Sequence, residues 1–304
     1  LAGLYVGITA LAATGGEFTK AAFVGAMRTE MDGLVEDVGN DLGRMAWGYG
    51  RGILATIQVG AASATQEVQN PHNVSVGSQT AGNRLINEND VLAVVNAGPP
   101  TTTVRGSANV VSISADGTDI TFDTSITTTT GDLVVRAGST GLGSTAVGST
   151  SVDKEPLGLL GLIDDATYMA TIGGLSRTTY PILRATVFSA VGAFSPDILQ
   201  RGLDAVDQIG GGSIDEFWCH HSVRRAYLTM TAGDVRYVGG DLKTRDAGTK
   251  AAKMKEITFG DIPWKIDRFA PFRTLFGVNF KTMERYVLKA GGWDAVVYET
   301  WRSD

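Results

Sequence analysis

The residues best suited to chemistry in this sequence are the consecutive Cys219, His220 and His221. A thiolate beside imidazoles could act as a nucleophile, and all three side chains are potential metal ligands. However, residues 216–220 have the apolar pattern of a buried strand, and successive side chains of a strand point to opposite faces. We therefore expect a structural strand here rather than a catalytic or metal-binding group.

The other reactive side chains predict no catalytic constellation either. His72 lies in a turn, where we expect it to be solvated. The carboxylates of Asp164 and Asp165 are adjacent in sequence, so they do not face each other as a general acid–base pair would. The basic stretch 236–255 could bind nucleic acid, but it contains no aromatic residue beyond Tyr237. A solvated loop or a subunit contact is therefore favoured there.

The sequence also lacks the motifs of common cofactor sites. It contains neither a Gly-x-x-x-x-Gly-Lys-Ser/Thr phosphate loop nor a Gly-x-Ser-x-Gly nucleophile elbow. A single cysteine excludes an intrachain disulfide and a cysteine-rich zinc site. We expect no catalytic residue, no cofactor and no metal, and hence a protein that is not an enzyme.

Composition favours a chain that packs against partners. The 304 residues include 26 Lys and Arg and 32 Asp and Glu, a net charge of −6, which disfavours coating of nucleic acid. Charged residues make up only 19% and hydrophobic residues 43%, and 39 residues are glycine. Such a chain is expected to bury much of its surface against partners, such as copies of itself. No apolar run is long enough for a membrane span.

A long amphipathic helix is predicted near the start, after a short strand at 4–13. Thr14 and Glu17 have the spacing of a capping box, which begins a helix. Apolar residues then recur every three or four positions, as on one helix face. From Glu17 to Trp47 the helix would span roughly 46 Å, and its glycines mean that it needs a sheet or a partner to lie on. The apolar stripe consists of Phe23, Met27, Met31, Leu34, Val38, Leu42 and Met45.

Residues 53–137 differ in composition from their surroundings. Thr, Ser, Val, Gly and Asn dominate, and short strands separated by turns predict a small β-barrel or sandwich inserted into the fold. The alternative is that these strands extend a neighbouring sheet. We expect flexible joins at 50–52 and 138–154. Strands are predicted at 53–59, 74–78, 90–96, 103–114, 119–123 and 131–137.

The second half of the sequence predicts a compact α/β unit. Ser195 and Pro196 have the residue types that begin a helix, and glycines at 210–212 end it. Ser222 is expected to cap a shorter helix that runs to about Thr231. Strands are predicted at 216–220, 262–267, 274–280, 284–289 and 293–301.

Several segments, taken in order, resemble a tailed-bacteriophage major capsid protein with a shell fold of the Hong Kong 97 type. They resemble the family's spine helix, the join after it, the segment that leads to the axial domain, and the axial domain's helix and strands. In this order they are Phe23-Val24-x-Ala26-Met27-x-x-Glu30-Met31-x-x-Leu34-x-x-Asp37; Gly50-Arg51-Gly52-Ile53-Leu54-Ala55; Gly158-Leu159-x-Gly161-Leu162 with Arg177-x-x-Tyr180-Pro181; and Val223-Arg224-Arg225-Ala226-Tyr227 with Gly260-x-Ile262-Pro263-x-x-x-Asp267-x-x-Ala270-Pro271.

The resemblance implies an α+β fold with a peripheral domain, an axial domain and a β-rich insertion. Almost nothing precedes the spine helix, where the family has an N-terminal arm and an extended loop, and the last peripheral strand is expected to be cut short after Trp301. The sequence is therefore expected to lack both ends of the fold. That loop carries the crosslinking lysine of some relatives, and we expect no such crosslink here. The expected divisions are 1–52 (peripheral, with the spine helix), 53–137 (insertion), 138–194 (linker and return), 195–290 (axial) and 291–304 (a peripheral strand).

The function implied by the resemblance is assembly. The chain would form hexamers and pentamers of an icosahedral phage head that encloses double-stranded DNA without specific binding. Its other expected partners are portal and scaffold or decoration proteins, and its expected location is the virion. Two alternatives stay open: an encapsulin-like nanocompartment shell around a protein cargo and, more remotely, a soluble α/β enzyme.

Overall fold

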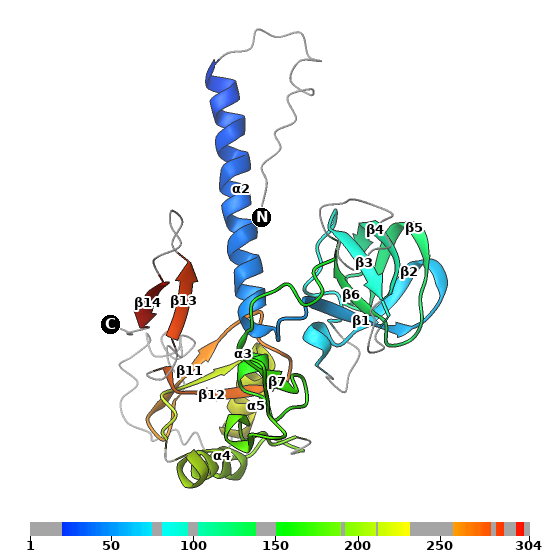
Figure 1. Ribbon diagram of the computed structural model, residues 1–304. Coiled ribbons are helices and arrows are strands. Elements are labelled where there is room, and N and C mark those ends of the chain that lie inside the picture. Colours follow the sequence, from blue (N-terminus) through cyan, green and yellow to red (C-terminus); the bar gives the residue numbers. More distant parts are fainter. Residues whose placement is uncertain are drawn as a thin grey trace, which may run out of the picture.

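The structure of the protein is a computed structural model. The described residues are 20–74, 81–96, 103–137, 150–189, 192–210, 212–231, 258–280, 284–288 and 296–300. They form a closed six-stranded barrel, a four-stranded sheet with two helices, and a long helix that extends away from both (Figure 1). The sequence-based prediction of a mixed α+β fold is confirmed at this level.

The long helix is α2 (Lys20–Trp47), which ends at the residue predicted from the sequence. Its end follows from the glycines after it: the Gly48 amide donates to the Met45 carbonyl over 3.0 Å, and Gly50 has a φ of 85°, a left-handed value that favours glycine. The predicted strand at 4–13 and the predicted capping box lie outside the described residues.

The β-rich segment forms a closed barrel, so the sandwich and the extended sheet are both wrong. The strands pair in the order β1-β2-β5-β4-β3-β6 and all six neighbouring pairs are antiparallel. Closure leaves no unpaired strand edge. The strands are β1 (Ile53–Val59), β2 (Ala62–Gln69), β3 (Val91–Val95), β4 (Val104–Ile113), β5 (Asp119–Thr127) and β6 (Leu133–Arg136).

Strand β2 is the barrel strand that the sequence did not predict. It reads Ala-Ser-Ala-Thr-Gln-Glu-Val-Gln, and its inward positions include the buried Gln66. The Gln66 amide donates to the carbonyls of Ser63 (2.6 Å) and Ile126 (3.0 Å) and accepts from the Thr128 hydroxyl (2.7 Å). These bonds satisfy a polar group inside the barrel, which apolar periodicity cannot reveal. The predicted strand at 74–78 is wrong at Val74, and the rest of it lies outside the described residues.

Two neighbouring barrel strands are buried on both faces. Val94 on β3 and Val134 on β6 face the barrel core, whereas their neighbours Val95 and Val135 pack into a second cluster that also holds Trp47 of α2. The barrel therefore shares an apolar core with the rest of the chain.

The join from α2 into the barrel is tightly packed, so the prediction of flexibility at 50–52 is wrong. Gly52 has a φ of 70°, and a Cβ there would lie 2.8 Å from the Ser151 carbonyl oxygen. At the other join, the structure describes only 150–154 of the predicted flexible stretch. Thr150 and Val152 in that part are buried, and Thr150 forms a β-bridge with Ala137. Both joins thus hold the barrel against the body.

The remainder of the chain builds a second core around a sheet in the order β10-β11-β9-β12. Its strands are β9 (Glu216–Cys219), β10 (Thr258–Phe259), β11 (Ile262–Ile266) and β12 (Leu275–Val278). Helices α4 (Pro196–Gly210) and α5 (His221–Thr231) supply Leu199 and Val223 to its core. The predicted cap of α4 is present, because the Ser195 hydroxyl accepts the Ile198 amide over 3.4 Å.

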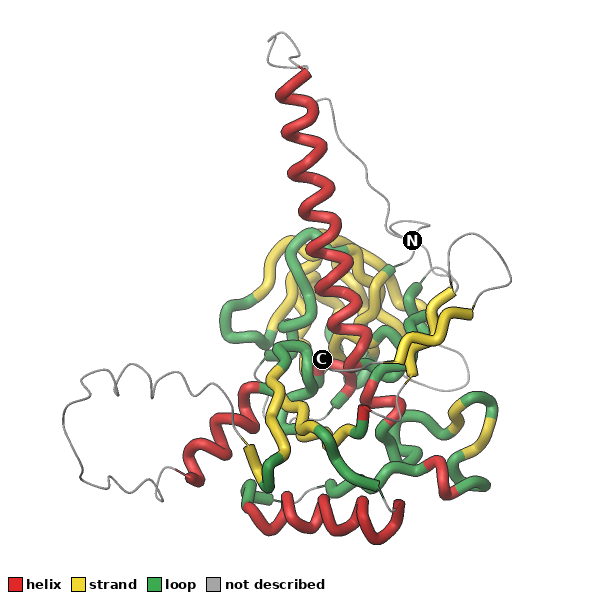
Figure 2. The backbone as a smooth tube through the Cα atoms, turned by 90° about the vertical axis from the view of Figure 1, so that its left-hand side faces the viewer, coloured by secondary structure: helices red, strands yellow, loops and turns green. Residues whose placement is uncertain are grey.

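Between the barrel and this unit runs a segment of short elements. They are α3 (Leu159–Leu162), β7 (Thr171–Ile172), β8 (Leu175–Ser176) and the 3-10 turn η3 (Pro181–Leu183). Near the C-terminus, β13 (Glu284–Leu288) pairs antiparallel with β14 (Val296–Thr300). Figure 2 gives a second view, in which the N-terminal half of α2 again extends beyond the barrel and the body.

Candidate functional site

The apolar stripe on α2 is largely exposed to solvent in the described part of the chain. The side chains of Met27, Met31, Val38 and Leu42 are exposed, and those of Leu34 and Met45 are half-buried. The side chain of Phe23 lies outside the described residues. Among the residues that the structure describes, no sheet covers the exposed part of the stripe.

The C-terminal end of α2 is anchored by ion pairs. The Arg44 guanidinium binds both carboxylate oxygens of Glu155, at 3.0 and 2.5 Å, and lies 3.3 Å from Asp41. Asp41 also accepts from Arg136 of β6 over 2.6 Å. Burial opposes the charge of Arg44, but its hydrogen bond and charge pairing with Glu155 leave its pKa above the ordinary value. The end of the helix is thus fixed to the 150–158 segment and to the barrel.

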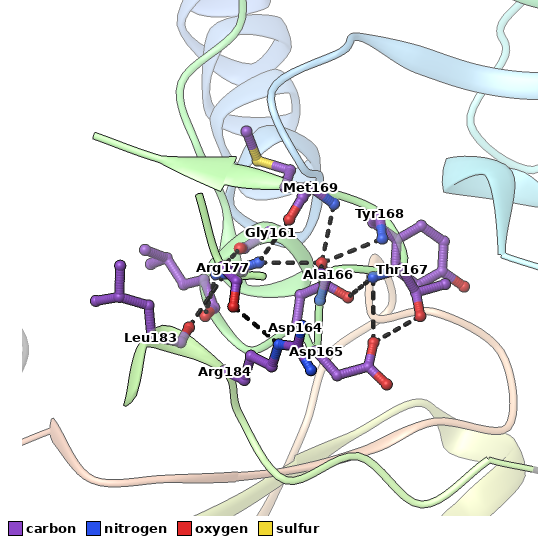
Figure 3. A network of polar contacts seen from close by, with 11 residues as sticks. Gly161, Asp164, Asp165, Ala166, Thr167, Tyr168, Met169, Arg177, Leu183 and Arg184 are labelled. Carbon is purple, nitrogen blue, oxygen red and sulfur yellow. Dashed lines mark hydrogen bonds and ion pairs between the residues drawn. The ribbon is translucent and has the colours of Figure 1, made fainter. Parts of the chain in front are cut away.

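A buried arginine organises the segment between the barrel and the body. Arg177 is fully buried, and its guanidinium lies 3.0 Å from the Asp164 carboxylate (Figure 3). The same guanidinium donates to the backbone carbonyls of Gly161, Leu162, Met169 and Leu183.

Asp164 is the hydrogen-bond acceptor that pairs with Arg177. Its carboxylate receives the backbone amides of Ala166, Thr167, Tyr168 and Met169 at 2.9–3.2 Å. Every polar atom of the pair is therefore engaged, which is what a buried ion pair needs to be tolerated. In the sequence Asp164 stands out only as one of two adjacent carboxylates, and this role was missed because Arg177 follows thirteen residues later.

His72 is buried, so the prediction of a solvated histidine is wrong. It lies in the 3-10 turn η1 (Pro71–Asn73) with a φ of 57°, and its Nε2 is 3.1 Å from the Phe269 carbonyl oxygen. Burial, with the nearby charge of Arg84, lowers the pKa of His72 to about 3. A neutral imidazole that donates from Nε2 fits this position.

Arg84 makes a second contact between the barrel segment and the same loop of the body. Its guanidinium donates to the Ala270 carbonyl over 2.9 Å and lies 5.6 Å from the centre of the Phe272 ring. Burial lowers the pKa of Arg84 to about 10, although the charge of Asp267 opposes that shift. His72 and Arg84 together dock the barrel onto residues 269–272.

The Cys219-His220-His221 run differs from its predicted arrangement. Strand β9 ends at Cys219, and His221 is the first residue of α5. His220, rather than Ser222, caps the helix: its Nδ1 accepts the Ser222 amide over 3.1 Å. The imidazoles of His220 and His221 stack with their centres 5.4 Å apart, which two residues of one strand could not do.

The chemical environment of these three residues favours packing. Burial raises the pKa of the Cys219 thiol to about 11, which disfavours the nucleophilic thiolate. Burial and the charge of Arg84 lower the pKa of His220 to about 4, and its ring lies against Phe272 at 4.4 Å between centres. Within the described ranges, no three His, Cys, Asp or Glu side chains are grouped as a metal would require. The basic stretch 236–255 lies outside those ranges.

Among the helices that the structure describes, none is long and apolar enough to cross a membrane. Comparison with known proteins provides no further guide, because no protein family, curated protein or solved structure matches this chain.

Proposed function

We propose that this chain is a structural shell subunit, a major capsid protein of the Hong Kong 97 type that assembles into the hexamers and pentamers of a phage head. The observation that carries this proposal is the α2 stripe, whose side chains Met27, Met31, Val38 and Leu42 are exposed in the part of the chain that the structure describes. Large contiguous apolar surfaces on a protein mark interaction sites. A subunit whose longest helix has no covering layer among the described residues is suited to gain stability from neighbours.

The uses of the reactive side chains agree with a structural role. Arg177 and Asp164 hold the backbone of the middle segment, His72 docks the barrel, and Cys219 fills a core. The net charge of −6 suits a wall that does not grip the phosphates of packaged DNA.

The order of elements supports the domains assigned by the resemblance. In this proposal 1–52 and 291–304 belong to the peripheral domain, 195–290 is the axial domain, and the barrel is an ornament on the outer surface of the head. Portal and scaffold or decoration proteins would be the other partners, and the assembled chain would reside in the virion.

Imaging tests the proposal directly. The full chain is expressed in a bacterial host, purified, and examined by size-exclusion chromatography and cryo-electron microscopy. Closed icosahedral shells or rings of six and five subunits are expected. Small shells around a protein cargo would favour the encapsulin-like alternative. A chain that stays monomeric at all accessible concentrations would overturn the proposal.

A pair of variants links assembly to the stripe. Leu34→Asp places a charge in the stripe and is expected to abolish shells while the circular dichroism spectrum stays close to that of the wild type. Gly33→Asp adds the same charge about a third of a turn away, where a Cβ would meet no atom within 4 Å. The control is expected to assemble normally. Equal assembly of both variants would show that the stripe is not an interface.

A further inference from the structure

The large apolar side chains of α2 between Met27 and Leu42 form one exposed surface, which we name the α2 patch. Five of the six are 37–71% exposed, and Leu34 is half-buried. Single exposed apolar residues are ordinary, but a contiguous patch marks an interaction site. The members of the α2 patch are Met27, Met31, Leu34, Val35, Val38 and Leu42.

The α2 patch lies on the side of the helix that faces away from the body. Near the C-terminal end of α2, Asn40 accepts a hydrogen bond from Arg268 of the body. A Cβ on Gly43 would lie 2.9 Å from the Phe269 ring. With 3.6 residues per turn, positions 40 and 43 share one side of the helix and the α2 patch occupies the opposite side. The described part of the body that contacts these positions therefore lies across the helix from the patch.

The spacing of the α2 patch is the same in both chain directions. The steps between its six members are 4, 3, 1, 3 and 4 residues. When two copies of the helix lie antiparallel about the midpoint of the patch, positions 27 and 42 are level with each other, as are positions 31 and 38. Leu34 and Val35 then lie at the two-fold axis, where each meets the same residue of the second copy. The patch is thus complementary to itself, as an isologous interface requires.

The size of the patch indicates which helix covers it. Helix α2 has 28 residues, whereas α4 has 15 and α5 has 11. Both shorter helices already contribute side chains to the core of their own sheet. Among the helices that the structure describes, a long exposed apolar row is therefore found on α2, and the matching partner is α2 of a second copy.

Asp41 favours the antiparallel orientation. Positions 27, 34 and 41 are seven residues apart, so in a parallel pair Asp41 would occupy the next layer of the seam and face Asp41 of the second copy. Its carboxylate is already held by Arg44 and Arg136, and two like charges in one layer are unfavourable. In the antiparallel pair, position 41 is level with Arg28 of the second copy instead.

We infer that α2 of one copy packs antiparallel against α2 of a second copy through the α2 patch. The inference goes beyond the proposed function, because the contact can form in a free dimer as well as in a shell. Within a shell it would join subunits of neighbouring rings, since the subunits of one ring meet through unlike surfaces. The paired length, from position 27 to position 42, is about 22 Å, so the free dimer is expected to be weak and reversible.

Disulfide crosslinking in the full chain tests the contact. The double variant Met31→Cys with Val38→Cys places thiols of the two copies level with each other, within the separation that a disulfide spans. After oxidation with copper phenanthroline, a dimer is expected on a denaturing gel without reductant. Positions 31 and 38 of one helix are about 10 Å apart along its axis, too far for an intrachain disulfide. The native Cys219 is buried, so the wild-type chain is the blank.

Single variants decide between arrangements. Met31→Cys alone is expected to give no dimer, because its two thiols lie about two turns apart in the antiparallel pair. A strong dimer from this variant would show a parallel pair and would overturn the inference. Val35→Cys alone, at the two-fold axis, is expected to crosslink, whereas Ile209→Cys, at a 77% exposed position on α4, is not. Equal crosslinking of these two variants would show random collision and would also overturn the inference.

The charged flank of the pair provides an independent measurement. In the antiparallel pair the exposed Glu30 lies on the same flank as Asp37 of the second copy and nearly level with it, and this like-charge contact occurs twice. Glu30→Lys reverses the sign of both contacts and is expected to strengthen dimerisation at least about threefold, measured by sedimentation velocity. Glu36→Lys makes the same change of charge on the far side of the helix and is expected to leave dimerisation unchanged. Equal effects of the two substitutions would contradict the arrangement.

Particle formation is followed in the same samples. Shells that form without the crosslink of the double variant would overturn the inference and leave the shell function standing. Crosslinked dimers without shells or rings would support the inference and contradict the shell function. A chain that stays monomeric would overturn both.

Discussion

Arg177 and Asp164 form an ion pair of 3.0 Å with both side chains almost completely buried, 0% and 2% exposed. The pair links α3, the 164–169 turn and the turn η3 through one guanidinium and one carboxylate. The pair stabilises the fold through these many backbone partners. An isolated buried ion pair adds little stability compared with apolar residues of the same size.

Removal of the arginine should therefore be costly. Arg177→Ala leaves a buried carboxylate without its counter-charge and four carbonyls without that donor, and we expect a loss of about 3–5 kcal/mol in the free energy of unfolding. Arg51→Ala is the matched control, because its 3.3 Å pair with Asp153 is partly exposed. It should cost less than about 1 kcal/mol. Urea denaturation measures both, and equal losses would contradict a structural role for the buried centre.

Stability should fall as the solution becomes acidic. His72 is neutral in the folded chain with a pKa of about 3, whereas an unfolded histidine titrates near 6.5. Below pH 6.5 the unfolded state binds a proton that the folded state does not bind, so the free energy of unfolding decreases until about pH 3. At pH 5 the loss from this residue is about 2 kcal/mol. His220, with a pKa of about 4, acts in the same direction.

The variant His72→Gln separates this effect from general acid denaturation. Its side-chain amide can still donate toward the Phe269 carbonyl but does not titrate. We expect a lower stability than the wild type at pH 7 and a shallower decline between pH 6.5 and 4, measured by urea denaturation across that range. An unchanged slope would show that His72 is not the group responsible.

The two neighbouring histidines should differ in their effect on stability. His220→Ala removes the acceptor of the Ser222 amide at the start of α5 and should cost about 1 kcal/mol. His220→Asn restores a capping acceptor and should recover most of that loss. His221→Ala should change thermal stability little. If the proposed function holds, all three variants assemble normally, and a specific turnover lost in His220→Ala with the fold intact would contradict a structural role.

Replacing glycines in the exposed part of α2 with alanine should increase the stability of the helix. A Cβ at Gly33 or Gly39 would meet no atom within 4 Å, so Gly33→Ala and Gly39→Ala should each stabilise the helix by about 0.5–1 kcal/mol. Gly43→Ala is the contrasting variant, because its Cβ would lie 2.9 Å from the Phe269 ring. It should gain less or lose stability. Circular dichroism during thermal unfolding measures helix content, and equal gains at all three positions would contradict the observed packing of Gly43.

Local sequence patterns determined the three longer helices and most strands. The end of α2 at Trp47 followed from its glycines, the start of α4 from Ser195, and β4 and β5 from their β-rich runs between turns. These patterns involve residues that are close together in the chain, so a single sequence is enough to recognise them.

Tertiary structure decided which faces are covered and which polar groups are buried. Strand β2 is held by Gln66 inside the barrel, and His72 is buried by a loop almost two hundred residues later in the chain. The periodicity that predicted the α2 stripe does not show whether the residues that cover it belong to the same chain or to another. Such features depend on contacts between distant segments, and Arg177 illustrates this most clearly: a charged residue in a turn-rich sequence becomes the centre of a buried network only once its carboxylate and carbonyl partners converge around it.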